Sequence, residues 1–367
     1  FFEADAVFMD RAGGGTGRQL ITGLDGANGG DASGGFQPGY RLSLGGQIFD
    51  YQVDASFLQI TPFGGATNGT LANMLILDDT AGNAIVDPAS IGNILAIPNG
   101  LFEATTVADE LTESERLIPG ATWTFQDRVN YRDFEINVGT ARDCRRWRAS
   151  VGYRHIKYDG NNRFLIAGDF DAIDTDDAAN PGDATNDPND GLAGTSINSV
   201  GFTGSGGFDS LLLNPGEVDR LTYVSQGLAN NELNGAQLTL SLRMLDGEWV
   251  TVEGYGKAGL FENNVTGRYS EYIVGTGDTT AQYVRHAVDR KTAAAFAGNL
   301  GFRAIISLTD YINLVGGYEA IFLAGVGLAG DQPGSVSRDF LGNRIYRVNN
   351  TGEVILHGGN VGLEILW

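Results

Sequence analysis

The chain has 367 residues, of which 45 are acidic and 24 are basic, so its formal net charge at pH 7 is −21. This acidic balance argues against a nucleic-acid partner, because phosphate contacts need clustered Lys and Arg. The sequence contains no run of about 18 apolar residues, which excludes a spanning helix but not a spanning barrel, in which half of each strand is polar.

The N-terminal half contains three regions with the two-residue period of a strand that has unlike faces. Residues 2–10 alternate in this way, and so do residues 40–44 and 49–57, which the glycines at 45 and 46 would join as a hairpin. A second hairpin is predicted from residues 129–138 and 146–154, with a turn near Thr140. Its alternation changes phase at Arg132 and Asp133, which predicts a β-bulge.

The C-terminal half continues the pattern. Residues 236–243 and 250–260 predict a third hairpin that turns at Asp246-Gly247, and residues 294–304 and 312–322 predict a fourth that turns at Thr309-Asp310. Residues 354–367 form a last alternating strand that ends on Trp367. The sequence therefore predicts ten strands.

The connections between these strands alternate between short and long. The long ones span residues 11–35, 61–119, 160–219, 264–290 and 326–352. Tight turns on one side, long loops on the other and an even strand count are typical of an outer-membrane barrel. We therefore predict one all-β domain over residues 1–367, a transmembrane antiparallel β-barrel of about ten strands, with 61–119 and 160–219 as its two long extracellular loops. A soluble β-sandwich is the alternative.

The first long loop leaves the strand count open. Residues 71–77 and 94–102 would add a hairpin and make twelve strands, and residues 109–116 would form a helical turn. Both long loops are acidic: eight acids and one base in 61–119, and eleven and one in 160–219.

The alternation assigns side chains to the two faces of the barrel wall. The outward, membrane-facing set includes Tyr51, Phe57, Trp147, Tyr153 and Trp367. The lumen-lining set comprises Asp50, Asp54, Glu135, Arg146, Arg148, Arg154, Arg243, Glu253, Lys257, Arg303 and Glu319. Over all polar faces, which also include Arg128 and Arg132, eight acids meet nine bases. Paired long side chains in so narrow a barrel predict a largely plugged lumen.

The sequence also contains an acidic tract and three histidines. An acidic tract in the second long loop offers oxygen ligands for Ca²⁺, although no EF-hand register is present; its candidate ligands are Asp169, Asp171, Asp174, Asp176 and Asp177. The three histidines, His155, His286 and His357, are isolated, and no hydrolase motif occurs. The sequence therefore predicts no enzyme. For the acidic tract it favours a solvated, flexible loop, with Ca²⁺ bound in the loops as the alternative and no other cofactor.

Three segments resemble a known family: residues 2–11 (FEADAVFMDR), 235–238 (GAQL) and 357–364 (HGGNVGLE) are similar to a beta-barrel porin family abundant in planctomycetes. The resemblance implies an exported outer-membrane barrel and carries over no functional residues. Position 1 is Phe rather than Met, which predicts a removed signal peptide. We expect a structural or assembly role through the acidic loops, in contact with outer-membrane lipid and with copies of the chain or a surface partner of the envelope. A narrow or oligomeric porin for small solutes or ions is the alternative.

Overall fold

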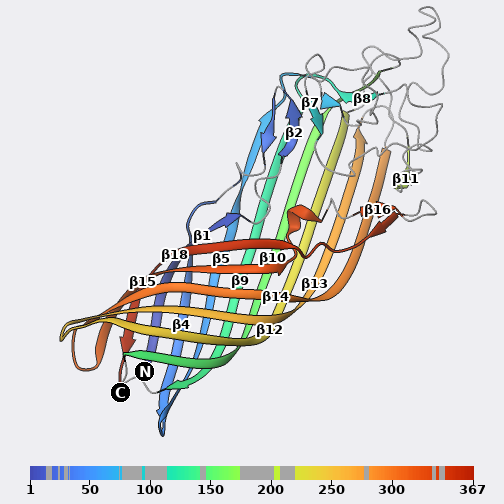
Figure 1. Ribbon diagram of the computed structural model, residues 1–367. Helices are drawn as coiled ribbons and strands as arrows, with labels where there is room; N and C mark the ends of the chain where they lie inside the picture. Colours follow the sequence, from blue (N-terminus) through green and yellow to red (C-terminus); the bar gives the residue numbers. More distant parts are fainter. Residues whose placement is uncertain are drawn as a thin grey trace, which may run out of the picture.

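The computed structural model describes residues 1–13, 19–23, 25–28, 32, 34–73, 75–76, 93–95, 114–140, 146–173, 202–206, 220–276, 281–332, 336–338 and 344–367. Ten strands form a closed antiparallel ring (Figure 1), in which each strand pairs with the next, β10 pairs with β12 and β18 pairs with β1. The strands are β1 (Phe2–Gly13), β4 (Gln37–Ile48), β5 (Tyr51–Thr70), β9 (Thr122–Thr140), β10 (Trp147–Ile173), β12 (Arg220–Asp246), β13 (Val250–Thr276), β14 (Ala281–Ser307), β15 (Ile312–Val326) and β18 (Gly352–Ile365). The predicted ten-stranded barrel is confirmed.

The remaining described elements are short and lie outside the ring: β2 (Gln19–Gly23), β3 (Ala27–Asn28), β6 (Leu75–Ile76), β7 (Asn93–Leu95), β8 (Ser114–Leu117), β11 (Thr203–Ser205), η3 (Ala329–Asp331), β16 (Val336–Arg338) and β17 (Arg344–Tyr346). The predicted extra hairpin is wrong in its described part, because β6 and β7 pair in parallel and join the ring only through β8, which pairs with β10. Residues 77 and 96–102 of that hairpin lie outside the described residues. The end of the predicted helical turn, residues 114–116, belongs to a strand, and residues 109–113 lie outside the described residues.

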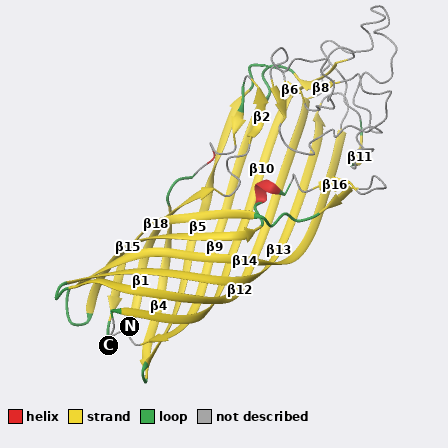
Figure 2. Cartoon of the chain, in the orientation of Figure 1, coloured by secondary structure: helices red, strands yellow, loops and turns green. Residues whose placement is uncertain are grey.

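The strands differ in length, so the barrel is taller on one side than on the other (Figures 1 and 2). Four neighbours, β10, β12, β13 and β14, have 27 residues each, whereas β15, β18, β1 and β4 have 12 to 15. The predicted loop 264–290 is wrong, because β13 and β14 occupy it almost entirely. The loops 61–119 and 160–219 likewise begin later, since β5 continues to Thr70 and β10 to Ile173.

One predicted turn lies elsewhere. Gly45 and Gly46 belong to β4, and the two-residue turn is formed by Phe49 and Asp50, because Ile48 pairs directly with Tyr51. Phe49 has a φ of 57°, in the left-handed region that favours glycine. The glycine pair therefore pointed to the wrong position. The turns at Asp246-Gly247 and Thr309-Asp310 lie as predicted.

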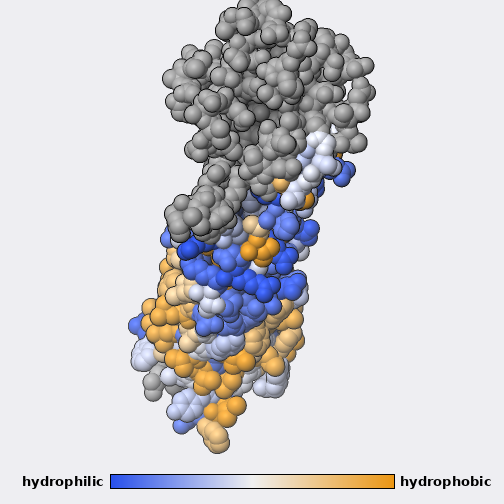
Figure 3. All heavy atoms as spheres, turned by 90° about the vertical axis from the view of Figure 1, so that its right-hand side faces the viewer, coloured by the Kyte–Doolittle hydropathy of each residue, from blue (hydrophilic) through white to orange (hydrophobic). Residues whose placement is uncertain are grey.

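The outer face of the wall changes chemistry partway along the strands. On β9, Phe134, Ile136 and Val138 face outward, and the outward residues continue without interruption through Arg132 and Arg128. The predicted β-bulge at Arg132 is therefore wrong: the alternation keeps its phase, and only the polarity of each face exchanges. Figure 3 shows hydrophobic residues over the turn end of this view and a hydrophilic zone above them.

We call the apolar outer zone at the turn end the apolar belt. It consists of the outward-facing residues within 2–8, 40–48, 51–57, 134–138, 147–153, 236–244, 250–260, 294–306, 312–324 and 355–365. None of them is Asp, Glu, Lys or Arg. Exposed aromatic residues mark its edge at the turns, namely Tyr51, Trp147, Trp249, Tyr311 and Trp367. An apolar band bordered by aromatic residues is the outer surface of a transmembrane β-barrel.

The inner face has the complementary order. At the level of the belt the inward side chains are polar and charged, and we call this set the polar layer. Beyond it, buried apolar side chains from nine of the ten strands form one cluster, the apolar layer. A second buried cluster lies further along the long strands and includes Phe164, Tyr223 and Ile273, together with Leu20 of β2. The wall is thus apolar outside and polar inside at the turn end, and the reverse above it.

Candidate functional site

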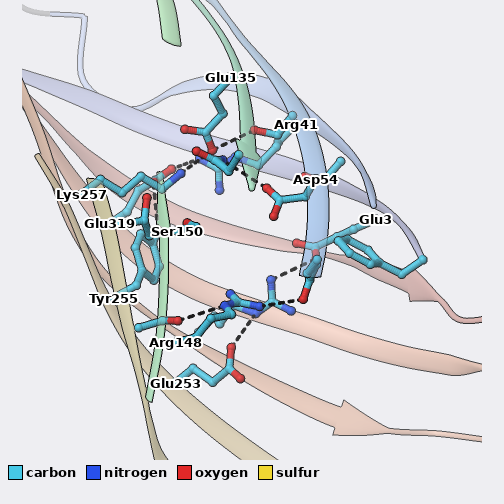
Figure 4. Close-up of a pocket in the computed structure, with 18 of the residues that line it drawn as sticks. Glu3, Arg41, Asp54, Glu135, Arg148, Ser150, Glu253, Tyr255, Lys257 and Glu319 are labelled. Atoms are coloured by element: carbon cyan, nitrogen blue, oxygen red, sulfur yellow. Dashed lines mark hydrogen bonds and ion pairs between the residues drawn. The ribbon is translucent and has the colours of Figure 1, made fainter. Parts of the chain in front are cut away.

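The polar layer encloses a cavity of about 140 Å³ near the turn end of the barrel (Figure 4). Its charged lining comprises five carboxylates and four cations: Glu3, Asp54, Glu135, Glu253, Glu319, Arg41, Arg148, Lys257 and Arg303. Serine, threonine and amide side chains fill the places between them. These residues come to one place because each is the inward member of an alternating strand.

Ion pairs across the lumen hold most of these charges. Arg41 pairs with Glu319, which also accepts a hydrogen bond of 2.9 Å from the hydroxyl of Tyr255. Lys257 pairs with Glu135 on the opposite wall. Partly buried charges need such partners because removal from water is costly. The interior is therefore cross-linked by side chains instead of being lined by free charges.

A second group lies closer to the turns. The guanidinium of Arg303 lies 3.1 Å from Glu3 Oε2, 3.5 Å from Glu364 Oε1 and 3.8 Å from Glu253 Oε2. Arg243 lies 3.9 Å from the other oxygen of Glu253. One arginine thus joins strands β1, β13 and β18, which helps to close the ring between the two ends of the chain.

Arg154 lies at the boundary between the polar and apolar layers, with 1% of its surface exposed. Its Nε and Nη2 donate to the two oxygens of Asp133 at 3.0 and 2.6 Å, and its Nη1 donates to Asn299 Oδ1 at 2.8 Å. This two-pronged pairing is the geometry in which a buried arginine is best compensated. Immediately above, Tyr131 and Ile156 begin the apolar layer.

The residues predicted to line the lumen fall into two groups. Nine of the eleven are inward: Asp54, Glu135, Arg148, Arg154, Arg243, Glu253, Lys257, Arg303 and Glu319. Two are not, because Asp50 lies in the β4–β5 turn and Arg146 precedes β10, and both are exposed. Arg128 and Arg132, also assigned inward, lie on the outer face. The described polar layer then holds eight acids and six bases instead of eight and nine: Glu3, Asp5, Asp54, Asp133, Glu135, Glu253, Glu319, Glu364, Arg41, Arg148, Arg154, Arg243, Lys257 and Arg303.

The residues predicted to face the membrane lie on the outer face. Tyr51, Trp147, Tyr153 and Trp367 are exposed, and Phe57 is partly covered by Tyr40, whose ring centroid lies 6.1 Å away. The important residue that sequence reasoning assigned to no face is Asp133. It was placed at a phase change, although the unbroken period of β9 would have directed it inward beside Arg154.

A separate buried ion pair lies far above the belt on the tall wall. Glu271 is fully buried and pairs with Arg285, and the hydroxyl of Tyr223 donates to its Oε1 at 2.6 Å. Burial raises the pKa of Glu271 above its ordinary value, because the loss of hydration outweighs the lowering effect of Arg285 and Tyr223. Arg285 lies over the ring of Phe202, 4.5 Å from its centroid.

The candidate calcium ligands are only partly described. Asp169 and Asp171 lie on β10, and Asp174, Asp176 and Asp177 lie outside the described residues. Within the described part of the chain no group of three acidic, histidine or cysteine side chains is placed to hold a metal ion. Nor does any described helix have the length and hydropathy to cross a membrane.

All three histidines lie on the outer face of the wall. His155 Nδ1 lies 2.7 Å from Asn234 Oδ1, and its Nε2 lies 3.7 Å from Glu232 Oε1. His357 Nδ1 lies 2.8 Å from the hydroxyl of Tyr318, and His286 is exposed on β14. The structure therefore brings none of them to the cavity or to the inner surface of the long strands.

No protein-family model matches the chain, and no curated protein does. Among solved structures, the outer membrane protease OmpT from Escherichia coli is similar over 100% of this chain and 93% of its own, at 10% identity and a TM-score of 0.34. The toluene transporter TbuX of Ralstonia pickettii is similar over 100% of this chain and 88% of its own, at 9% identity and a TM-score of 0.22. The toluene transporter TodX of Pseudomonas putida is similar over 99% of this chain and 88% of its own, at 8% identity and a TM-score of 0.24. The planctomycete family resemblance stays a prediction.

Proposed function

We propose that the protein is an outer-membrane barrel whose lumen is plugged by its own side chains and whose role is structural. The turns face the periplasm, and the long acidic connections 71–119 and 174–219 face the exterior, where they contact copies of the same chain or a surface partner. Single-chain outer-membrane barrels have short periplasmic turns and long external loops, which supports this orientation.

The apolar layer is the observation that carries the proposal. Its side chains come from nine strands around the ring and meet across the interior, and among them Tyr131, Ile156, Leu233, Ile321 and Leu356 are fully buried. Side chains of ten strands are enough to fill such an interior, whereas open aqueous porins need about 16 strands. The polar cavity beneath is therefore a blind vestibule on the turn side.

Planar-bilayer recording tests the proposal. The purified protein should insert without producing stable steps of conductance, and a large porin of known conductance serves as the positive control. Insertion itself is checked by protease protection of the barrel in vesicles. Regular conductance steps from inserted protein would support the alternative, a narrow or oligomeric porin.

The assembly part of the proposal has its own test. The two long connections, residues 71–119 and 174–219, carry seven and nine net negative charges, so facing copies repel unless a cation lies between them. We propose that Ca²⁺ or a similar divalent ion bridges them. Chelation should then lower the oligomer size in light scattering, and calcium but not sodium should restore it. An oligomer that withstands chelation would contradict the bridging.

A further inference from the structure

Four basic side chains lie on the outer face of β9 and β10 above the apolar belt, with Arg132 and Lys157 nearest to it and Arg128 and Arg163 further along the strands. We call these four residues the β9–β10 basic patch. Arg132 lies directly opposite Lys157 in the register of the two strands. Like charges in that position repel, so an unoccupied patch destabilises the sheet locally.

The patch has few counter-charges. Lys157 Nζ lies 3.3 Å from Glu232 Oε1, and both side chains are about half exposed. The three arginines form no ion pair with any residue in the described ranges. The described outward carboxylates of these two strands above the belt are Asp159, which interacts electrostatically with Lys157 and Arg132, and Asp169 near the far end of β10. In a chain with a net charge of −21, a cationic surface at this level requires an explanation.

The height of the patch suggests what it meets. On β9, Arg132 is the next outward residue after Phe134 of the belt. On β10, Lys157 is two outward positions beyond Tyr153, and the tyrosine hydroxyl donates to Asn234 Oδ1 at 2.7 Å. Tyrosine at the edge of an apolar belt lies at the level of lipid headgroups, so the patch faces the headgroup region of one leaflet.

The belt below the patch is hollowed on the neighbouring strands. A groove of about 760 Å³ is lined by the outward alanines Ala236 and Ala258, and Tyr153, Leu260 and Phe296 are among the larger side chains that line it. A second groove of about 480 Å³ continues toward the turns, where Gly254 and Gly256 face outward beside Leu240, Leu242 and Met244. Small outward residues on β13 thus leave an apolar trough that begins beside the patch.

We propose that the patch and the trough together bind one anionic lipid whose headgroup carries phosphate. The phosphate lies against Arg132 and Lys157 and removes their mutual repulsion, and an acyl chain fills the trough. The charge of the patch complements phosphate, and guanidinium groups hold phosphate by two parallel hydrogen bonds. A second copy docked by the same surface would place two basic patches together, which disfavours a symmetric dimer there.

Native mass spectrometry of the detergent-solubilised full chain tests this. Dimyristoyl phosphatidate and dimyristoyl phosphatidylcholine are added in separate samples, and the lipid retained per protein is counted. Wild type should retain one phosphatidate about tenfold better than phosphatidylcholine, and Arg132→Gln/Lys157→Gln should abolish that preference. The matched variant Arg268→Gln/Arg290→Gln removes two exposed outward arginines of β13 and β14 and should keep it.

The trough is tested separately. Ala236→Phe/Ala258→Phe fills it and should lower retention of both lipids, whereas Ala4→Phe/Ala6→Phe, two outward alanines of β1 across the ring, should not. Circular dichroism and size exclusion show that each variant is folded.

Equal retention by the patch variant and its control would overturn the proposal. So would displacement of phosphatidate by equimolar inorganic phosphate, which would indicate a free anion site. A change in oligomer size with unchanged lipid retention in the filled variant would overturn it in favour of an interface between copies. These measurements use micelles, so they do not depend on whether the lumen conducts.

Discussion

At the scale of single residues, the barrel depends on buried charges that are compensated within the protein. Arg154 reaches Asp133 with two donors and also bonds Asn299, at the point where polar side chains give way to apolar ones. The attraction in such a pair roughly offsets the cost of removing both ions from water, but one partner left alone pays that cost in full. The pair therefore constrains what either position tolerates.

Replacing Arg154 by Met should lower the free energy of unfolding by about 3–5 kcal/mol, because the buried Asp133 carboxylate loses its counter-charge. The double variant Arg154→Met/Asp133→Asn should recover most of this loss. Urea unfolding in lipid vesicles, followed by tryptophan fluorescence, gives the energies. The control Arg146→Met changes an exposed residue and should stay within about 0.5 kcal/mol. A double variant no more stable than the single one would contradict the pairing.

The Glu271 site should make the stability of the tall wall depend on pH. Burial raises the pKa of Glu271, so its contribution to stability is complete below the ordinary glutamate pKa and declines as the pH rises through the raised value. Tyr223→Phe removes a hydrogen bond to the ionised carboxylate, and should cost about 1.5–3 kcal/mol above that range and much less below it. Hydrogen exchange of upper β13, corrected for intrinsic rates, measures this. Tyr272→Phe, exposed on the same strand, is the control, and an equal loss at both pH values would contradict the assignment.

At the scale of elements, the strands show what a two-residue period reveals and what it conceals. The period located all ten strands, because it records two unlike faces whatever surrounds them. It does not record which solvent each face meets. Above the belt Val129 and Tyr131 face inward and Arg132 faces outward. The apolar residues therefore move from even to odd positions although the strand keeps its period, and in the sequence this looks like a phase slip. For the same reason the sequence predicts a loop at the upper halves of β13 and β14, since most of their outward residues are polar.

Strand β12 allows a direct test, because its outer face is expected to meet lipid within the belt and water above it. Leu240 and Asn230 both face outward and are exposed, the first within the belt and the second above it. Leu240→Arg should cost about 2–4 kcal/mol in vesicles, because a charge enters the lipid zone, whereas Asn230→Arg should change stability by less than about 0.5 kcal/mol. Urea titration of refolded protein measures both. Similar costs at the two positions would mean that the belt does not meet lipid.

At the scale of the whole molecule, the barrel has two zones, one arranged for lipid around its outer face and one arranged for water. Its turn end has the inside-out order of a membrane barrel, held by Arg41, Arg303 and their carboxylates. Its tall end has the order of a soluble β-protein, with an apolar interior and a polar outer face. The inward charges predicted both the polar cavity and a largely plugged lumen, but they did not predict the apolar layer, because that layer depends on side chains from nine strands meeting at one level.

Side-specific labelling of cysteines tests whether the apolar layer closes the lumen, as proposed. In a Cys144→Ser background, Ser150→Cys places a thiol in the cavity, and Ala297→Cys places one in the apolar layer, where the native side chain is 1% exposed. A membrane-impermeant maleimide added from the turn side should modify position 150, and position 297 should react about tenfold more slowly or less, because it requires local opening. The same reagent added from the loop side should reach neither position. Rapid modification of position 150 from both sides would instead mean a continuous aqueous path. The paired charges of the polar layer would then line a pore, and the protein would be a transporter instead of a structural protein.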